Sequence, residues 1–341
     1  MQELRIGIIG AGIMGQWHAR VYRTHPQCQM IAVSDLNQEK AQALASQFDI
    51  PHVFESHQEM LSEADLDLVS VCTPDFAHAT PAINCANAGK HVLIEKPLAV
   101  TVEDAQAIIA AARRNAVKAM AQFSHRWVPA YRQTKDLLAS GELGEPVLAY
   151  ARKNDHIYVP TEMLKWANHS TPAWFLSSHD IDLVCWYFET EPEEVYANAV
   201  RKVLVKQGVD TPDAIQAQVR FTDGAVATFE ACWIYPNTFP TMTDSFVEVI
   251  TTGAVIHLDR KREQIEVSTV NGFQYPRNLL GYAYEGAEIH GAVPLSIHHF
   301  VKCVLLDREP LVTLESSLRV TRILDAIQRS IDLGAPVRLE S

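Results

Sequence analysis

The sequence predicts an α/β domain built on a doubly wound parallel sheet, followed by an α+β domain with a large, mainly antiparallel open sheet. The first third of the chain alternates short apolar runs with helical patterns, which is typical of βαβ units. Longer segments rich in Val, Ile, Thr and Phe begin after about residue 125. The length of 341 residues suits two domains of roughly 150 residues each. We therefore expect one domain over 1–125 and another over 126–341.

The first domain contains five apolar runs of strand length, at 4–9, 29–34, 68–72, 91–95 and 117–122. Helical patterns rich in Ala, Gln and Glu lie between them, at 37–47, 78–88 and 101–115. Asn37 and Thr101 are suitable N-cap residues, and Gly89 suits a left-handed helix end. Alternation of this kind predicts parallel strands with helices on both faces of the sheet.

The second domain begins with a helical pattern at 129–140 that ends at Gly141. Strand-like segments follow at 147–152, 195–205, 214–221, 225–233, 245–251, 254–258 and 264–268. Asp223-Gly224 lies between two of them and is a hairpin signal. Two helical patterns, at 294–306 and 315–333, close the chain. These helices are too few to cover both faces of the sheet, so we expect an uncovered face that forms a homodimer or homotetramer.

Charge and composition exclude several classes of function. Lys plus Arg number 29 and Asp plus Glu 41, a net charge of −12 that disfavours nucleic acid but allows an anionic small substrate. No apolar run reaches about 18 residues and no secretory signal is apparent, so we expect no membrane span. The 6 cysteines form no CxxC pair and no zinc-ligand spacing, which predicts no metal site and favours a reducing, cytoplasmic compartment.

The strongest local motif is a glycine loop directly after the first strand. It comprises Gly10, Gly12, Ile13, Met14 and Gly15, with Ala11 between the first two glycines. Glycines in this pattern permit a tight turn, the approach of a pyrophosphate, and close packing of helix on strand. Asp35 ends the second strand, where a carboxylate can accept hydrogen bonds from a ribose diol. Leu36 and Asn37 supply no cation for a 2′-phosphate, so the loop favours NAD over NADP; the alternative is a glycine turn without a ligand.

Two further motifs follow strands at the same sheet edge, where open α/β sheets bind ligands. Thr73-Pro74 ends one strand, and His78 nearby is either a cofactor contact or a helix-start residue. Glu95-Lys96-Pro97 ends the next strand, which places Lys96 where nicotinamide and substrate could meet. Proline restricts Lys96 to extended geometry and permits a cis peptide bond.

Polar candidates for substrate binding occur in the second domain. Asn154 and Asp155 come just after its first predicted strand and are candidates for hydroxyl recognition. Trp166 and His169 lie in a long connection, where they either line a substrate pocket or pack a loop. His179 begins an amphipathic helical pattern, and it is either a packed histidine or a group that faces the site.

Taken together and in this order, these motifs resemble the Gfo/Idh/MocA family of nicotinamide-dependent sugar and cyclitol dehydrogenases. The resemblance also covers Gly89–Ala99, Phe123–Tyr131 with Arg126, Ser140–Pro146 and His179–Trp186. It implies a Rossmann domain and an α+β domain whose open sheet commonly mediates oligomers. It also implies that Lys96 and His179 lie at the reaction centre. Many members carry an Asp four residues before that His, whereas this chain has Phe175.

We therefore expect hydride transfer between NAD and a carbinol carbon of a sugar, cyclitol or related polyol. His179 would act as general acid/base, and Lys96 would bind the reacting hydroxyl and stabilise alkoxide charge. Asp182 would either orient His179 or cap local structure. Two alternatives remain: a dinucleotide-binding sensor without turnover, which the substitution at Phe175 weakly favours, and an oxidoreductase acting on a non-sugar carbonyl or double bond.

Overall fold

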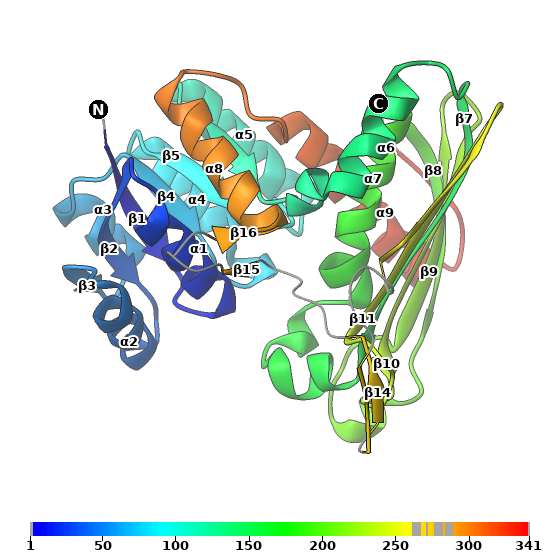
Figure 1. The fold of residues 1–341 in the computed structure, drawn as a ribbon, viewed down its shortest axis with the longest axis horizontal. Helices are drawn as coiled ribbons and strands as arrows, with labels where there is room; N and C mark the ends of the chain where they lie inside the picture. The colour runs from blue at the N-terminus through cyan, green and yellow to red at the C-terminus, as the bar shows by residue number, and fades with distance from the viewer. Residues whose placement is uncertain (1–2, 261–266, 271, 276–281, 284–288, 340–341) are drawn as a thin grey trace. The chain divides into compact units, whose positions relative to one another are not determined.

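The computed structural model describes residues 3–260, 267–270, 272–275, 282–283 and 289–339. The chain packs as two compact units, Met1–Trp127 with Leu280–Leu318, and Val128–Leu279 with Arg319–Ser341 (Figure 1). The segment from Leu280 to Leu318 thus packs with the first unit, and the domain limits at 125 and 126 remain a prediction.

The first unit contains a parallel six-stranded sheet of order β3-β2-β1-β4-β5-β6. Its strands are β1 Leu4–Ile9, β2 Cys28–Ser34, β3 His52–Phe54, β4 Leu68–Val71, β5 His91–Ile94 and β6 Ala119–Ala121. The order runs outward in both directions from β1 and β4, so right-handed crossovers place helices on opposite faces. The predicted doubly wound sheet is confirmed. The short β3 was not predicted.

Helices connect these strands. They are α1 Ile13–Thr24, α2 Gln38–Phe48, α3 His57–Glu63, α4 Ala79–Asn87 and α5 Val102–Arg114, with single turns at Asp75–Ala77 and Ser124–Trp127. Of these, α2, α3 and α5 begin at residues whose side chains cap them. The side chains of Asn37 and Thr101 accept hydrogen bonds from the backbone N–H groups of Lys40 and Asp104. Both predicted N-caps are therefore confirmed.

A late helix, α8 Ala292–Leu305, completes the first unit. One side of α8 is apolar and buried, comprising Val293, Ile297, Phe300 and Val301. His299 lies 5.2 Å, between ring centroids, from Trp127, and Arg126 donates a hydrogen bond to the carbonyl of Leu311. This apolar side explains why a segment so late in the chain returns to the first unit.

The second unit contains a seven-stranded mixed sheet of order β12-β11-β7-β10-β9-β8-β17. Its strands are β7 Pro146–His156, β8 Pro192–Val200, β9 Ala214–Phe221, β10 Val226–Tyr235, β11 Thr243–Thr251, β12 Val255–Asp259 and β17 Val337–Arg338. β7 and β10 pair in parallel, whereas the other pairs are antiparallel. The predicted mainly antiparallel sheet is confirmed.

Two short strand pairs lie outside these sheets. They are β13 Val267–Thr269 with β14 Gly272–Gln274, and β15 Tyr282–Ala283 with β16 Ile289–His290. The predicted strand at 264–268 falls partly outside the described residues, because only its last two residues belong to β13.

The helices α6 Pro129–Ala139, α7 Ser178–Phe188 and α9 Leu314–Leu333 lie along one face of the seven-stranded sheet, and the boundary between units falls within α9 (Figure 1). Alternate residues of β10 face this layer and are buried: Ala227, Phe229, Ala231 and Trp233. In the described part of the chain, no helix covers the opposite face, which we call the helix-free face. No described helix is long and apolar enough to cross a membrane.

Two strand ends differ from the prediction for identifiable reasons. The predicted strand 195–205 ends as β8 at Val200, because the buried Asp213 carboxylate accepts hydrogen bonds from the N–H groups of Lys202, Val203 and Leu204. The predicted strand 147–152 continues as β7 to His156, because β11 pairs with it as far as Asp155 and β10 pairs with His156. Side-chain capture shortens one strand, and cross-strand pairing lengthens the other.

Candidate active site

The glycine loop lies between β1 and α1. Glycine occupies its three positions for different structural reasons. Gly10 has a φ of +98°, and a Cβ there would lie 2.6 Å from the carbonyl oxygen of Cys72. A Cβ at Gly15 would collide with the carbonyl oxygen of Gly10. A Cβ at Gly12 would meet nothing within 4 Å. Packing therefore requires the first and third glycines, whereas the second leaves open space against the backbone.

That open space adjoins the N-terminus of α1. Gly12 is the N-cap residue and contributes no side-chain hydrogen bond. The first N–H groups of a helix lack partners within the helix, and they carry the positive end of its dipole. Together with the space above Gly12, they form a suitable cradle for a pyrophosphate. The residues present therefore fit a dinucleotide.

Asp35 follows β2 and is held in place by the backbone. Its two carboxylate oxygens accept hydrogen bonds of 2.7 Å from the N–H groups of Ala11 and Asn37. These contacts leave further lone pairs on both oxygens, because a carboxylate has about four acceptor positions. Leu36 is 96% exposed and carries no charge. Asp35 is thus fixed beside the glycine loop, as ribose recognition requires.

Backbone contacts tie together the loops after β4 and β5. The ring nitrogens of His78 lie 2.7 Å and 3.0 Å from the carbonyl oxygens of Pro97 and Thr73. Burial lowers the pKa of His78, and its contacts with the two carbonyl oxygens oppose that shift. The described contacts of His78 are both to backbone, and a contact to the cofactor stays a prediction.

Glu95, Lys96 and Pro97 immediately follow β5. Glu95 is 6% exposed, and its Oε1 lies 3.0 Å from Nε2 of the fully buried His18 on α1. Lys96 is half-buried, and the peptide bond before Pro97 is cis. The parallel sheet therefore brings the glycine loop, Thr73 and Lys96 to the carboxyl ends of neighbouring strands. Sequence reasoning missed His18, and the only signal was a histidine on the sheet-facing side of α1.

In the second unit, His179 is the second residue of α7 and is half-buried. The next residue, Asp180, forms an ion pair with Lys153 of β7 at 3.1 Å, and both side chains are almost fully buried. Burial raises the pKa of Asp180. Asp182, two residues further along α7, is also fully buried. Sequence reasoning missed the pair of Lys153 and Asp180, which anchors the start of α7 to the sheet.

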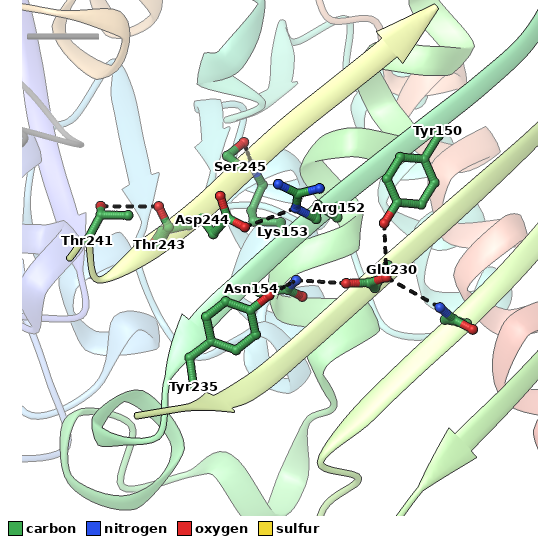
Figure 2. Close-up of polar contacts among 11 residues, drawn as sticks. Tyr150, Arg152, Lys153, Asn154, Glu230, Tyr235, Thr241, Thr243, Asp244 and Ser245 are labelled. Carbon is green, nitrogen blue, oxygen red and sulfur yellow. Dashed lines mark hydrogen bonds and ion pairs between the residues drawn. The ribbon is translucent and has the colours of Figure 1, made fainter. Parts of the chain in front are cut away.

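The structure corrects the placement of Asn154 and Asp155. Both lie inside β7 rather than after it, so their side chains point to opposite faces of the sheet. Asn154 donates hydrogen bonds to Glu230 at 2.8 Å and to Tyr235 at 2.9 Å, on the helix-free face (Figure 2). Asp155 accepts one of 2.6 Å from Thr243. The structure therefore does not bring these two residues together.

Phe175 and Trp166 belong to a small apolar cluster in the second unit. The ring centroid of Phe175 lies 6.0 Å from that of Trp166 and 6.3 Å from that of Trp233. The centre of the cluster consists of Val159, Leu164, Ala167, Leu176, Leu204, Ala231 and Trp233. An ionised carboxylate at position 175 would have to lose its hydration here. Trp166 packs against this cluster and His169 is exposed, and a role for either residue in a substrate pocket stays a prediction.

Known proteins match almost the whole chain. One family model, described as an oxidoreductase family with an NAD-binding Rossmann fold, matches residues 4–123, and its C-terminal α/β domain matches residues 135–339. The scyllo-inositol 2-dehydrogenase (NAD⁺) of Bacillus subtilis is 26% identical over 99% of this chain and 97% of its own. The 1,5-anhydro-D-fructose reductase of Ensifer adhaerens is 30% identical over 66% of this chain and 68% of its own.

Solved structures show the same fold. The scyllo-inositol dehydrogenase of Lactobacillus casei, crystallised with NAD(H) and scyllo-inositol, superposes with a TM-score of 0.85. The match covers 99% of each chain at 23% sequence identity. At this identity the likeness establishes the fold alone.

Proposed function

The chain belongs to the Gfo/Idh/MocA family of NAD-binding oxidoreductases, and from that premise we propose that it is a dehydrogenase of cyclitols or closely related polyols. When bound, NAD supplies the hydride acceptor for oxidation of a CH–OH group. Everything else, including binding, orientation and movement of the hydroxyl proton, falls to the protein.

The observation that carries this proposal is the glycine loop with its fixed carboxylate. Of the three glycines, Gly12 alone could carry a Cβ without a steric clash. The open space beside it lies at the start of α1. Asp35 stands next to that space, held by two backbone N–H groups. We assign the pyrophosphate to the Gly10–Gly15 loop and the adenosine ribose to Asp35.

The chemistry is assigned to one residue of each unit. Lys96 follows β5 and would hold the reacting hydroxyl oxygen through its ammonium group, which favours the developing alkoxide. His179 at the start of α7 would accept the hydroxyl proton, because an imidazole titrates near neutral pH. Asp180, ion-paired with Lys153, fixes the first turn of α7 and with it the backbone of His179.

The polyol class is supported by the relatives. Relatives in both comparisons are named for inositols or for a sugar derivative, and the match to the B. subtilis dehydrogenase covers almost the entire chain. Such substrates are neutral and rich in hydroxyl groups. A chain with a net charge of −12 is compatible with a neutral substrate.

A substrate panel tests the proposed function. Purified protein is incubated with NAD or NADP and with inositol isomers, aldoses, sugar acids and sugar phosphates, and the absorbance of reduced nicotinamide is followed. We expect the highest kcat/KM for a cyclitol with NAD. Turnover only of non-polyol carbonyls would refute the substrate class. Tight NAD binding with no turnover of any compound would favour the sensor.

We also propose that the helix-free face mediates a homodimer or homotetramer. Apolar side chains on this face are exposed, including Leu148 at 39%, Tyr196 at 41%, Val200 at 44% and Val255 at 58%. Tyr196→Glu should lower the molar mass measured by light scattering. Val205→Glu changes a residue of similar exposure, 41%, outside the sheet, and should leave the mass unchanged. A monomeric wild-type protein would refute this proposal.

A further inference from the structure

A continuous chain of buried polar groups crosses the first unit beneath the Glu95-Lys96-Pro97 loop. The hydroxyl of Tyr22 lies 2.7 Å from Oγ of Ser70, and that oxygen lies 3.0 Å from Nδ1 of His18. Nε2 of His18 lies 3.0 Å from Oε1 of Glu95. These polar groups thus connect α1 with β4 and the end of β5, which lie much further along the sequence.

Every group in this chain has a partner. Nε2 of His18 faces the carboxylate of Glu95, and its Nδ1 faces the hydroxyl of Ser70. The hydroxyls of Ser70 and Tyr22 can each donate or accept, so Ser70 can satisfy Nδ1 of His18 in either tautomer of the ring. The other oxygen of Glu95, Oε2, lies 3.3 Å from the backbone nitrogen of Lys96. This series of hydrogen-bonded groups therefore ends at Lys96, the residue that we assign to substrate binding.

Burial of these polar side chains costs free energy, and close packing alone does not explain why they are present. His18 and Ser70 are 0% exposed, Tyr22 is 1% exposed and Glu95 is 6% exposed. A buried ion pair or polar network often contributes no more stability than apolar side chains of the same volume. What such a network does provide is a fixed geometry, because each member has one arrangement that satisfies all hydrogen bonds.

We propose that His18 and Glu95 are positioning residues for Lys96, fixing its backbone relative to the glycine loop. This proposal rests on the proposed function. His18 lies on α1, the helix that begins with the glycine loop, so one side chain joins the dinucleotide-binding element to the loop of Lys96. The protein thereby sets the spacing between its cofactor-binding and substrate-binding groups through a single buried contact.

The variants His18→Ala, His18→Gln, Glu95→Gln and the double variant His18→Ala/Glu95→Gln test this idea. A misplacement of about 1 Å can cost roughly 100-fold in rate, so we expect His18→Ala to lower kcat by about 10- to 100-fold with little change in substrate KM. Gln has a donor and an acceptor, so His18→Gln should retain more activity than His18→Ala. The double variant should be no worse than the more affected single variant, because the two residues act together.

A second readout does not depend on turnover. The rate at which an amine reagent modifies Lys96, measured by mass spectrometry of its peptide, should differ from wild type in His18→Ala and in Glu95→Gln. His91→Gln is the matched control, because His91 begins the same strand and its Nδ1 accepts a backbone hydrogen bond from Lys118 at 2.9 Å. This control should leave both the labelling rate and kcat unchanged.

The outcomes separate the two proposals. If the wild-type protein turns over no polyol but Lys96 labelling changes as expected, the proposed function fails while the positioning role stands. If labelling of Lys96 is unchanged in His18→Ala, the positioning role is refuted. A rise in the dissociation constant of NAD, with normal Lys96 labelling and normal kcat, would instead show that the network serves only the glycine loop.

Discussion

The two units of the chain position polar residues in different ways. In the first unit, the motif residues follow the carboxyl ends of parallel strands, so the backbone alone gathers the glycine loop, Thr73 and Lys96 at one edge. In the second unit, polar side chains project from within strands, and the pairing register decides which of them meet. Asn154 donates a hydrogen bond to Glu230 of β10 (Figure 2). Its neighbour Asp155 accepts one from Thr243 of β11. The position of a motif after a parallel strand therefore follows from the backbone, whereas the position of a motif within a mixed sheet depends on the pairing register.

The strongest test of this comparison removes one proposed catalytic residue from each unit. Lys96→Ala and His179→Ala should each lower kcat by about 100-fold or more, the scale of a positioned acid or base. NAD binding, measured by calorimetry, should remain close to wild type because the Gly10–Gly15 loop is unchanged. Exposed residues of the same types provide the controls, Lys206→Ala and His52→Ala. A wild-type rate in either test variant would show that its unit does not supply the chemistry.

The apolar cluster around Phe175 gives the next largest expected effect. Phe175→Asp should lower the free energy of unfolding by about 2–3 kcal/mol, because a half-buried ring is lost and a carboxylate must be desolvated among Trp166 and Trp233. Phe175→Leu should cost less, about 1 kcal/mol. Urea unfolding followed by tryptophan fluorescence measures both. Higher activity with unchanged stability in Phe175→Asp would instead place position 175 in the site.

The next prediction concerns the preference of the first unit for NAD over NADP. Asp35→Ser removes a charged acceptor whose hydrogen bonds contribute about 1.5 kcal/mol each, so the preference for NAD over NADP should fall by roughly tenfold. The variant should still bind both cofactors, because the glycine loop is intact. Calorimetric titration of wild type and variant with both dinucleotides measures the ratio. Equal affinity of the wild type for NAD and NADP would contradict the role of Asp35.

The smallest expected effect is a loss of stability of the first unit at acidic pH. Burial lowers the pKa of several histidines of the first unit: His25, His57, His78, His91, His299 and His298, the last to about 4. The unfolded chain binds these protons near pH 6.5, before the folded unit does, so the stability that the neutral rings contribute is present above that pH and is lost as the pH falls.

Hydrogen exchange at about pH 7 and about pH 5.5 measures this loss, because exchange reports local opening. After correction for the intrinsic pH dependence of exchange, peptides from β4 and β5 should lose more protection than peptides from β9 and β10. His78→Gln should reduce the difference, because it removes one of the buried rings. Greater loss of protection in the second unit would contradict the prediction.

The sequence was most informative where chemistry depends on backbone conformation. The glycine loop, Asp35 and the N-caps at Asn37 and Thr101 occupy their predicted positions, because each requirement is local. His18 could not be found in this way, because its partner Glu95 lies 77 residues further along the chain. The placement of Asn154 and Asp155 was wrong because the length of β7 is set by pairing with β11, which local sequence does not reveal.

The return of α8 to the first unit has a consequence for the order in which the protein is made. β1 to β6 leave the ribosome first, but the apolar side of α8 that covers part of their unit follows only after β7 to β12 have been synthesised. Until residue 305 emerges, the surface around Trp127 lacks the side chains that pack against it. The nascent first unit is therefore incomplete while the second is being made, and closing a loop of that length slows its completion.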